Sequence, residues 1–205
     1  MEKNFVVFEG LDAAGKSLMA KKLKLFLEKN GFAGRVFLTA EPSQSPFGKE
    51  LREMLKSESS PKNNAQKFLE LYVKDREFHL EHEILPALNE GKIVLCDRFK
   101  YSTVVYQSVQ GISVEKILQM HDGMVVPGLV LVLDIDPRLA LKRIACSARG
   151  ARDVFEREAF LQKAREKFLQ LPKILPKENI KIIDASMPKK EVFSAVVSEA
   201  KNVLF

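Results

Sequence analysis

Residues 8–17 of the chain read FEGLDAAGKS, and they continue directly from the apolar stretch at residues 5–8. Within this segment, residues 10–17 match the pattern G-x-x-x-x-G-K-[ST] at every fixed position. The apolar stretch before it is short and rich in valine and phenylalanine, as in a buried strand. Residues 17–30 after it place apolar side chains on one stripe and lysines on the other, which predicts an amphipathic helix. A strand, a glycine loop and a helix in this order predict a phosphate-binding loop.

The residue types of this loop suit that chemistry. Gly10 and Gly15 let the backbone curl so that successive N–H groups point at phosphate oxygens, and the helix N-terminus adds its positive end. Lys16 can reach the outer phosphates, and the hydroxyl of Ser17 can bind Mg²⁺. The plainer alternative is a glycine turn followed by a chance Lys-Ser pair. The predicted strand before the loop and the predicted helix after it disfavour this alternative. The residues expected to bind a nucleoside triphosphate are Gly10, Leu11, Asp12, Ala13, Ala14, Gly15, Lys16, Ser17 and Leu18.

The rest of the chain alternates between strand-like and helix-like segments. Strands are predicted at residues 35–39, 92–96, 129–135 and 180–183, and helices at 47–56, 65–89, 102–108, 138–146, 155–171 and 189–203. Strands separated by helices favour right-handed crossovers and a parallel sheet. We therefore predict an α/β chain with the three-layer P-loop NTPase fold, in which helices flank a five-stranded parallel sheet. The absence of repeats and linkers predicts a single P-loop kinase domain over residues 1–205.

Acidic residues follow the ends of most predicted strands, where ligands bind in such folds. After the strand at 92–96, Asp97 is expected to hold Mg²⁺ through water, and Arg98 is placed to meet a second phosphate. No N-K-x-D segment follows a late strand, which counts against a GTPase. The chain is also short for a motor protein. These features favour a kinase that acts on a small phosphorylated acceptor.

Composition says less about the ligands, partners and cellular location of the protein. The net charge is +6, from 33 basic and 27 acidic residues spread along the chain, which favours anionic ligands but is also typical of a solvated surface. No apolar run reaches membrane-spanning length and no signal-peptide pattern opens the chain, so we expect a cytoplasmic location, with no membrane and no nucleic acid polymer as partner. Cys96 and Cys146 are expected to be reduced packing residues. The three histidines show no metal-ligand spacing and are expected at the surface.

At this point the chain resembles the thymidylate kinase family. The resemblance runs through most of the chain, in order, at residues 8–17, 41–42, 71–76, 97–99, 102–107, 141–143, 152–156 and 183–186. It implies ATP-dependent phosphorylation of dTMP to dTDP with Mg²⁺, by a homodimer. A kinase for another nucleotide or nucleoside and a non-catalytic nucleotide-binding paralogue are the alternatives.

The resemblance also implies roles for particular residues. Tyr72 would stack on the acceptor base, Arg76 would hydrogen-bond to it, and Tyr106 would pack on the deoxyribose. Arg143 would stack on adenine, with Ala185 opposite. The full set of implied acceptor-binding residues is Asp12, Glu41, Arg52, Tyr72, Arg76, Arg98, Thr103, Tyr106 and Gln107. Amphipathic helices with surface polar residues are the plainer interpretation of several of these positions.

Two departures from the family pattern concern arginines. Family members carry a catalytic arginine either in the phosphate loop or on a lid. Ala13 occupies the loop position here, so the lid segment at residues 147–155 is expected to supply Arg149 or Arg152, beside the catalytic Lys16 and Arg98. In the other departure, Ala40 replaces an arginine and residues 43–45 lack the family's glycines. Arg52 or Lys49 is expected to compensate.

Overall fold

A parallel sheet forms the centre of the computed structural model, which describes residues 1–58, 60, 63–146, 155 and 157–205. In these residues five strands pair side by side in the order β2-β3-β1-β4-β5, all parallel. Their bounds are β1 Glu2–Gly10, β2 Val36–Ala40, β3 Ile93–Asp97, β4 Pro127–Asp134 and β5 Ile180–Asp184. The predicted α/β architecture and its parallel sheet are confirmed.

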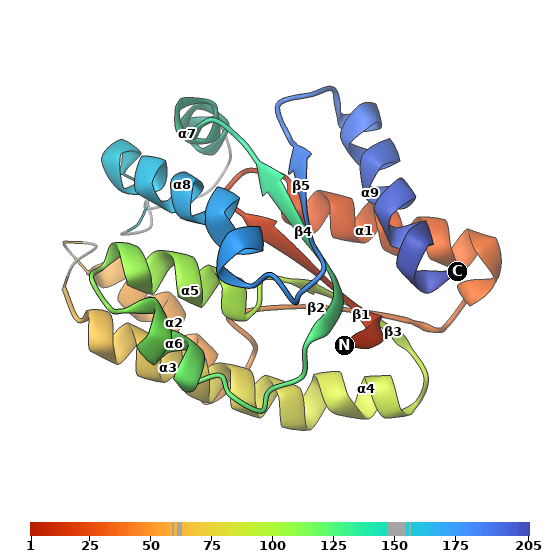
Figure 1. Ribbon diagram of the computed structural model, residues 1–205, viewed down its shortest axis with the longest axis horizontal. Helices are drawn as coiled ribbons and strands as arrows, with labels where there is room; N and C mark the ends of the chain where they lie inside the picture. Colours follow the sequence, from red (N-terminus) through yellow and green to blue (C-terminus); the bar gives the residue numbers. More distant parts are fainter. Residues whose placement is uncertain (59, 61–62, 147–154, 156) are drawn as a thin grey trace.

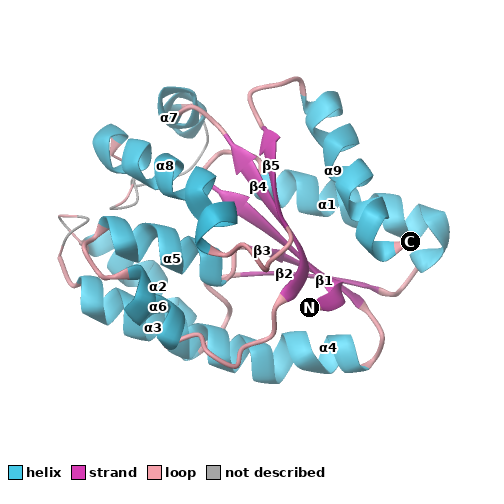
Figure 2. Ribbon diagram, in the orientation of Figure 1, coloured by secondary structure: helices cyan, strands magenta, loops and turns pink. Residues whose placement is uncertain are grey.

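Helices cover both faces of this sheet (Figures 1 and 2). Their bounds are α1 Lys16–Leu27, α2 Pro46–Ser57, α3 Ala65–His79, α4 Leu85–Asn89, α5 Lys100–Val109, α6 Val114–Gln119, α7 Pro137–Ala145, α8 Glu158–Ile174 and α9 Lys189–Leu204. Helices α1 and α9 lie together on one face, while α5 and α8 lie on the other. Helices α2 and α3 pack against each other, and α3 also contacts α5, so the second layer is the thicker one.

The helix boundaries follow local chemistry. The predicted helix at 65–89 is helical throughout: α3 continues through a π-helical segment, Leu80–Ile84, into α4, and the residues at both junctions have helical dihedral angles. Pro86 is the second residue of α4 and lies two positions after the end of the π-helical segment. Gly31 adopts a φ of 98° in the π-helical segment Glu28–Phe32 that follows α1, a left-handed conformation that favours glycine where a helix ends. The six-residue helix α6 was not predicted from the sequence.

Strand β1 is the central strand and its apolar residues are fully buried. Phe8 is paired with Asp97 of β3 on one side and with Leu131 of β4 on the other. A Cβ at Gly10 would overlap the carbonyl oxygen of Leu133, so glycine is required there for close packing as well as for its φ of 129°. The phosphate-loop segment therefore leaves the middle of the sheet, beside the end of β3.

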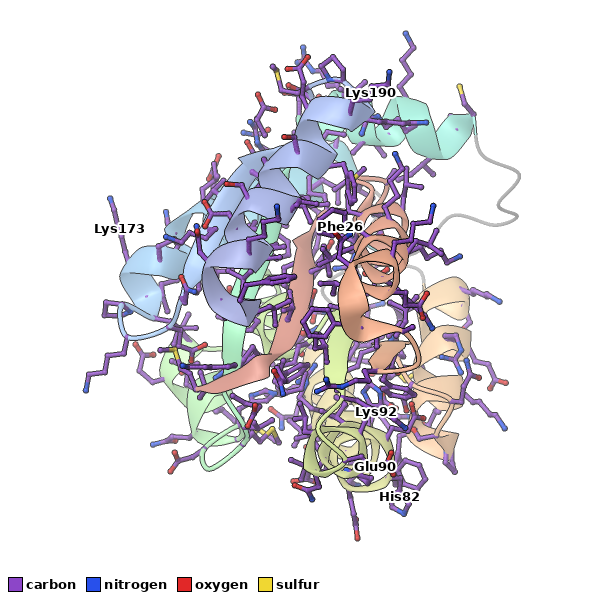
Figure 3. The ribbon with its side chains drawn as sticks, turned by 90° about the vertical axis from the view of Figure 1, so that its right-hand side faces the viewer. Phe26, His82, Glu90, Lys92, Lys173 and Lys190 are labelled. Carbon is purple, nitrogen blue, oxygen red and sulfur yellow. The ribbon has the colours of Figure 1, made fainter. Side chains whose placement is uncertain are left out.

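The face formed by α1 and α9 is closed by aromatic contacts. The rings of Phe26 and Phe193 meet edge to face at 6.3 Å, and Figure 3 shows Phe26 between the two helices. Cys96 is buried, but Cys146 is exposed, so the prediction that both cysteines pack in apolar surroundings is wrong for Cys146. Its position after the last turn of α7 leaves it in solvent. None of the helices in the described part of the chain is both long and apolar enough to cross a membrane.

Two leucines of α1 provide a matched test of this packing. Leu23 is fully buried, whereas Leu25 is 58% exposed. We expect Leu23→Ala to lower the free energy of unfolding by about 2–5 kcal/mol, because it removes buried contacts and leaves a cavity. Leu25→Ala should change it by less than about 0.5 kcal/mol. Urea denaturation measures both, and equal losses would contradict the described orientation of α1.

Candidate active site

A cavity of about 820 Å³ opens at the carboxyl ends of β1, β2 and β3. It lies between the phosphate loop and helices α2, α3 and α5, as expected for a ligand site in a parallel sheet. The predicted residues that line it are Asp12, Ala13, Gly15, Lys16, Ser17, Leu18, Glu41, Arg52, Tyr72, Arg76, Asp97, Arg98, Tyr106 and Gln107. The structure thus brings most of the residues predicted for the two substrates into one space. Among the described residues, the predicted ones that do not line it are Gly10, Leu11, Ala14, Thr103, Arg143 and Ala185.

Lys16 occupies the floor of the phosphate loop. Its ammonium group donates hydrogen bonds to the carbonyl oxygens of Gly10 at 3.2 Å and Leu11 at 2.8 Å. Burial, with a further contribution from the neighbouring Arg98, lowers the pKa of Lys16 to about 8. Among the described residues its hydrogen bonds go to neutral carbonyl oxygens, so this buried ammonium strongly attracts an incoming anion.

Arg98 lies directly across from the loop, at the junction of β3 and α5. Its backbone has a φ of 77°, a conformation that costs a non-glycine residue about 1–2 kcal/mol. Its side chain donates to the carbonyl of Gly10 at 3.1 Å, to Ser102 Oγ at 2.8 Å and to Asp12 Oδ1 at 2.9 Å. These contacts direct the guanidinium into the cavity beside Lys16.

Glu9, at the end of β1, binds the junction between β3 and α5. It is fully buried, and its carboxylate accepts from the backbone N–H groups of Phe99 at 2.8 Å and Ser102 at 3.2 Å, and from Ser102 Oγ at 2.5 Å. Burial raises the pKa of Glu9, while the positive charge of Arg98 opposes the shift. Sequence analysis counted Glu9 among the acidic residues that follow the strands but gave it no role. Its signal was its position directly after the apolar run at residues 5–8.

Ser17 and Asp97 meet at the mouth of the loop. The hydroxyl of Ser17 donates to Asp97 Oδ2, and Oδ1 of the same carboxylate is buried with no hydrogen-bond partner in the described residues. A hydroxyl and a carboxylate with an unused oxygen are the hard ligands that Mg²⁺ prefers, together with substrate phosphates. The pair therefore fits the predicted metal site. The described residues contain no cluster of three or more His, Cys, Asp or Glu side chains suited to a metal.

On the far side of the cavity, Arg76 is fixed among several partners. Its guanidinium is 1% exposed, and Glu41 Oε2 accepts from its Nε at 3.0 Å and its Nη2 at 2.6 Å. Nη2 also donates to Thr103 Oγ1 at 3.2 Å. Thr103 itself is buried outside the cavity lining, so it reaches a ligand only through Arg76.

The loop after β2 is held by a buried carboxylate. Asp75 accepts from the N–H of Ser43 at 2.8 Å, from its hydroxyl at 2.6 Å, and from the hydroxyl of Ser45 at 2.5 Å. Arg52 donates to the carbonyl oxygens of Pro42 and Ser43, both at 2.8 Å. Ser43 and Ser45 therefore bind this loop to α3.

The two residues proposed to compensate for Ala40 differ in position. Arg52 lines the cavity together with Ala40, whereas Lys49 is not among the described lining residues. Lys56, one turn beyond Arg52, also lines it and was not selected from the sequence.

Arg143 connects the phosphate loop to the segment after β5. It donates to the carbonyl oxygens of Ala13 and Ala185, each at 3.3 Å. Arg149 and Arg152 lie outside the described residues. Of the expected lid segment at 147–155, only Phe155 is described, and its buried ring lies 5.3 Å from that of Tyr106.

The prediction that the histidines lie at the surface is wrong for two of the three. His79 is fully buried and His121 is 4% exposed, while only His82 is exposed. His79 Nδ1 lies 3.2 Å from Glu41 Oε1, and His121 Nε2 lies 2.6 Å from Arg76 Nη1. Hydrogen bonds to charged partners offset the cost of burying these rings.

The sequence matches proteins of one family over nearly its full length. The family model described as thymidylate kinase matches residues 8–196. A protein of Pyrococcus horikoshii described as a probable thymidylate kinase is 34% identical over 208 residues, which span 100% of this chain and 98% of that protein. A thymidylate kinase of Geobacillus sp. strain WCH70 is 36% identical, with coverage of 97% and 96%.

The fold matches as well. The crystal structure of thymidylate kinase from Ehrlichia chaffeensis superposes with a TM-score of 0.73 at 26% sequence identity. The aligned region covers 95% of this chain and 96% of that one.

The Asp75 contacts make a testable contribution to stability. We expect Asp75→Asn to lower the free energy of unfolding by about 1–3 kcal/mol, because an amide replaces one acceptor oxygen with a donor that faces other donors. Asp122→Asn changes an exposed carboxylate and should have little effect. Urea denaturation compares the two variants, and a similar small change in both would contradict the loop-holding role of Asp75.

Proposed function

The chain belongs to the thymidylate kinase family and phosphorylates dTMP to dTDP, and we propose that its cavity binds Mg·ATP on the phosphate-loop side and dTMP against α3 and α5. The observation that carries this arrangement is the shared cavity. Lys16 lines it from the phosphate loop, Arg98 from the junction of β3 and α5, and Arg76 from α3. A single cavity therefore has positively charged side chains for both phosphorylated ligands.

On the donor side, the phosphate loop and Lys16 bind the triphosphate, and Arg143 with Ala185 borders the adenine. Ser17 and Asp97 would hold Mg²⁺. When bound, this ion supplies positive charge between the outer phosphates. The support is the meeting of the Ser17 hydroxyl with the Asp97 carboxylate and the unused buried oxygen of that carboxylate.

On the acceptor side, Arg98 grips the 5′-phosphate and Arg76 hydrogen-bonds to the thymine base. Tyr72 stacks on the base, and Tyr106 packs on the deoxyribose. Their positions on the cavity wall support these roles. The same wall includes the other proposed acceptor residues Asp12, Glu41, Arg52 and Gln107, with Thr103 behind Arg76.

Catalysis in this arrangement is electrostatic. The acceptor phosphate is already anionic, so no covalent intermediate and no strong base are needed. Lys16, Arg98 and a lid arginine, Arg149 or Arg152, neutralise charge on the transferring phosphoryl group. The remaining proposals are that the whole chain is one kinase domain, that it is a homodimer, and that it is cytoplasmic.

An ADP-release assay with Mg·ATP and dTMP tests the reaction and the lid together. We expect release to depend on dTMP, and either Arg149→Ala or Arg152→Ala to lower kcat by about a thousandfold, as loss of a transition-state arginine does. Lys163→Ala, which removes an exposed cation of α8, serves as the control and should keep full activity. No dTMP-dependent release would contradict the proposed function, and activity in both arginine variants would contradict the lid assignment.

The metal assignment has its own test. EDTA should abolish turnover, and Ser17→Ala should raise the Mg²⁺ concentration for half-maximal rate by at least about tenfold. Ser17→Thr keeps a hydroxyl at the same position and should retain nearly normal Mg²⁺ dependence. Equal Mg²⁺ titrations for the alanine and threonine variants would exclude Ser17 as a ligand.

A further inference from the structure

The guanidinium of Arg76 has almost all of its donors already assigned. A guanidinium carries five N–H groups, one on Nε and two on each terminal nitrogen. Glu41 accepts from Nε and Nη2, Thr103 accepts from Nη2, and His121 accepts from Nη1. Within the part of the chain that the structure describes, one N–H of Nη1 has no protein partner. Because Arg76 lines the cavity, this N–H is the donor available to a ligand.

The protonation of His121 follows from its two partners. Its Nδ1 lies 2.7 Å from the carbonyl oxygen of Ile117, which can only accept, so Nδ1 carries the proton. Its Nε2 lies 2.6 Å from Arg76 Nη1, which can only donate, so Nε2 presents its lone pair. Burial, together with the charge of Arg76, lowers the pKa of His121 to about 3, and the ring remains neutral.

The opposite edge of the guanidinium is held just as firmly. Glu41 Oε2 binds Nε and Nη2, while its Oε1 lies 3.2 Å from Nδ1 of the buried His79. His79 Nε2 in turn lies 2.7 Å from Thr39 Oγ1. Arg76 is thus held at both edges, by a carboxylate that His79 orients and by the imidazole of His121.

We propose that His121 is a positioning residue that directs the remaining Nη1 N–H of Arg76 at the base and thereby selects a pyrimidine with a carbonyl group at position 4. The role of His121 rests on the proposed function, in which Arg76 meets the base of dTMP. His121 belongs to the loop after α6 and does not line the cavity, so it acts only through Arg76.

The chemistry of the base explains the selection. Thymine presents an acceptor oxygen at position 4, whereas cytosine presents an amino group that donates. A guanidinium whose one available group is an N–H can bond to the first and is opposed by the second. Without the His121 acceptor, Nη1 has a second unsatisfied N–H in a buried place, which favours rotation or an added water. Either change weakens the alignment on which the discrimination depends.

The test uses His121→Met and His121→Gln, two side chains of equal length. Only glutamine ends in a strong acceptor for Arg76, because the thioether sulfur of methionine accepts weakly. We expect the methionine variant to raise KM for dTMP by about tenfold and to lower the kcat/KM ratio of dTMP over dCMP by about tenfold, the size of one charge-assisted hydrogen bond. KM for ATP should stay within about twofold, since only acceptor binding is changed. His121→Gln should recover most of the selectivity. His82→Met, at the exposed histidine, is the control and should match wild type.

Several outcomes would overturn the proposal. If the methionine and glutamine variants share one dTMP:dCMP ratio, His121 contributes packing alone. Nitrogen NMR of the wild-type imidazole gives a measurement that needs no variant to fold. A neutral ring protonated on Nδ1 between pH 5 and 8, with an Nε2 shift that moves on dTMP binding, supports the role, and a charged or Nε2-protonated ring refutes it. If wild type does not use dTMP at all, the proposed function fails first, which the ADP-release assay reveals separately.

Discussion

The buried carboxylate of Glu9 joins the two halves of the site. It stands at the end of the central strand, one residue before the phosphate loop, and its oxygens bind the first residues of α5. This contact crosses about 90 positions of sequence, as the separation between Glu9 and Phe99 shows. It stabilises the turn in which Arg98 adopts its positive φ, and so it places the acceptor-side cation against the donor-side loop. Without it, the register between β1 and β3 would align the strands but not the side chains beyond them.

The sequence was sufficient for the fold and for most of the cavity wall. The phosphate-loop pattern and the buried strands depend on local signals, namely glycine spacing and apolar runs. Parallel strands have their carboxyl ends at one edge of the sheet. The sequence alone therefore predicted that Asp97, Arg98 and Glu41 belong to one site. The hydrogen-bond partners of the site residues could not be predicted in this way. Arg76 meets His121 across 45 positions and Ser43 meets Asp75 across 32, and no local periodicity encodes such pairs.

The wrong prediction for the histidines has a traceable cause. Polar residue type favours the surface unless a partner is known, and the partner of His121 depends on helix α6, which the sequence pattern did not reveal. That helix has only six residues and ends at Gln119, two positions before His121. The missed helix therefore concealed one of the contacts that orient Arg76.

The cations of the site are held in two different ways, and the difference matches what each must do. Lys16 is held by backbone carbonyl oxygens, which are neutral partners that a phosphate oxygen can outcompete. Arg98 donates to the carboxylate of Asp12, to the carbonyl oxygen of Gly10 and to the hydroxyl of Ser102. Arg76 instead has a buried carboxylate on one edge and an imidazole on the other. Loss of the carboxylate would leave a buried charge unpaired, and loss of the imidazole would leave a buried N–H without its acceptor. In the proposed function, cations that follow a moving phosphoryl group need exchangeable partners, whereas a cation that recognises a base needs a fixed orientation. The partners of Lys16, Arg98 and Arg76 within one cavity match this division.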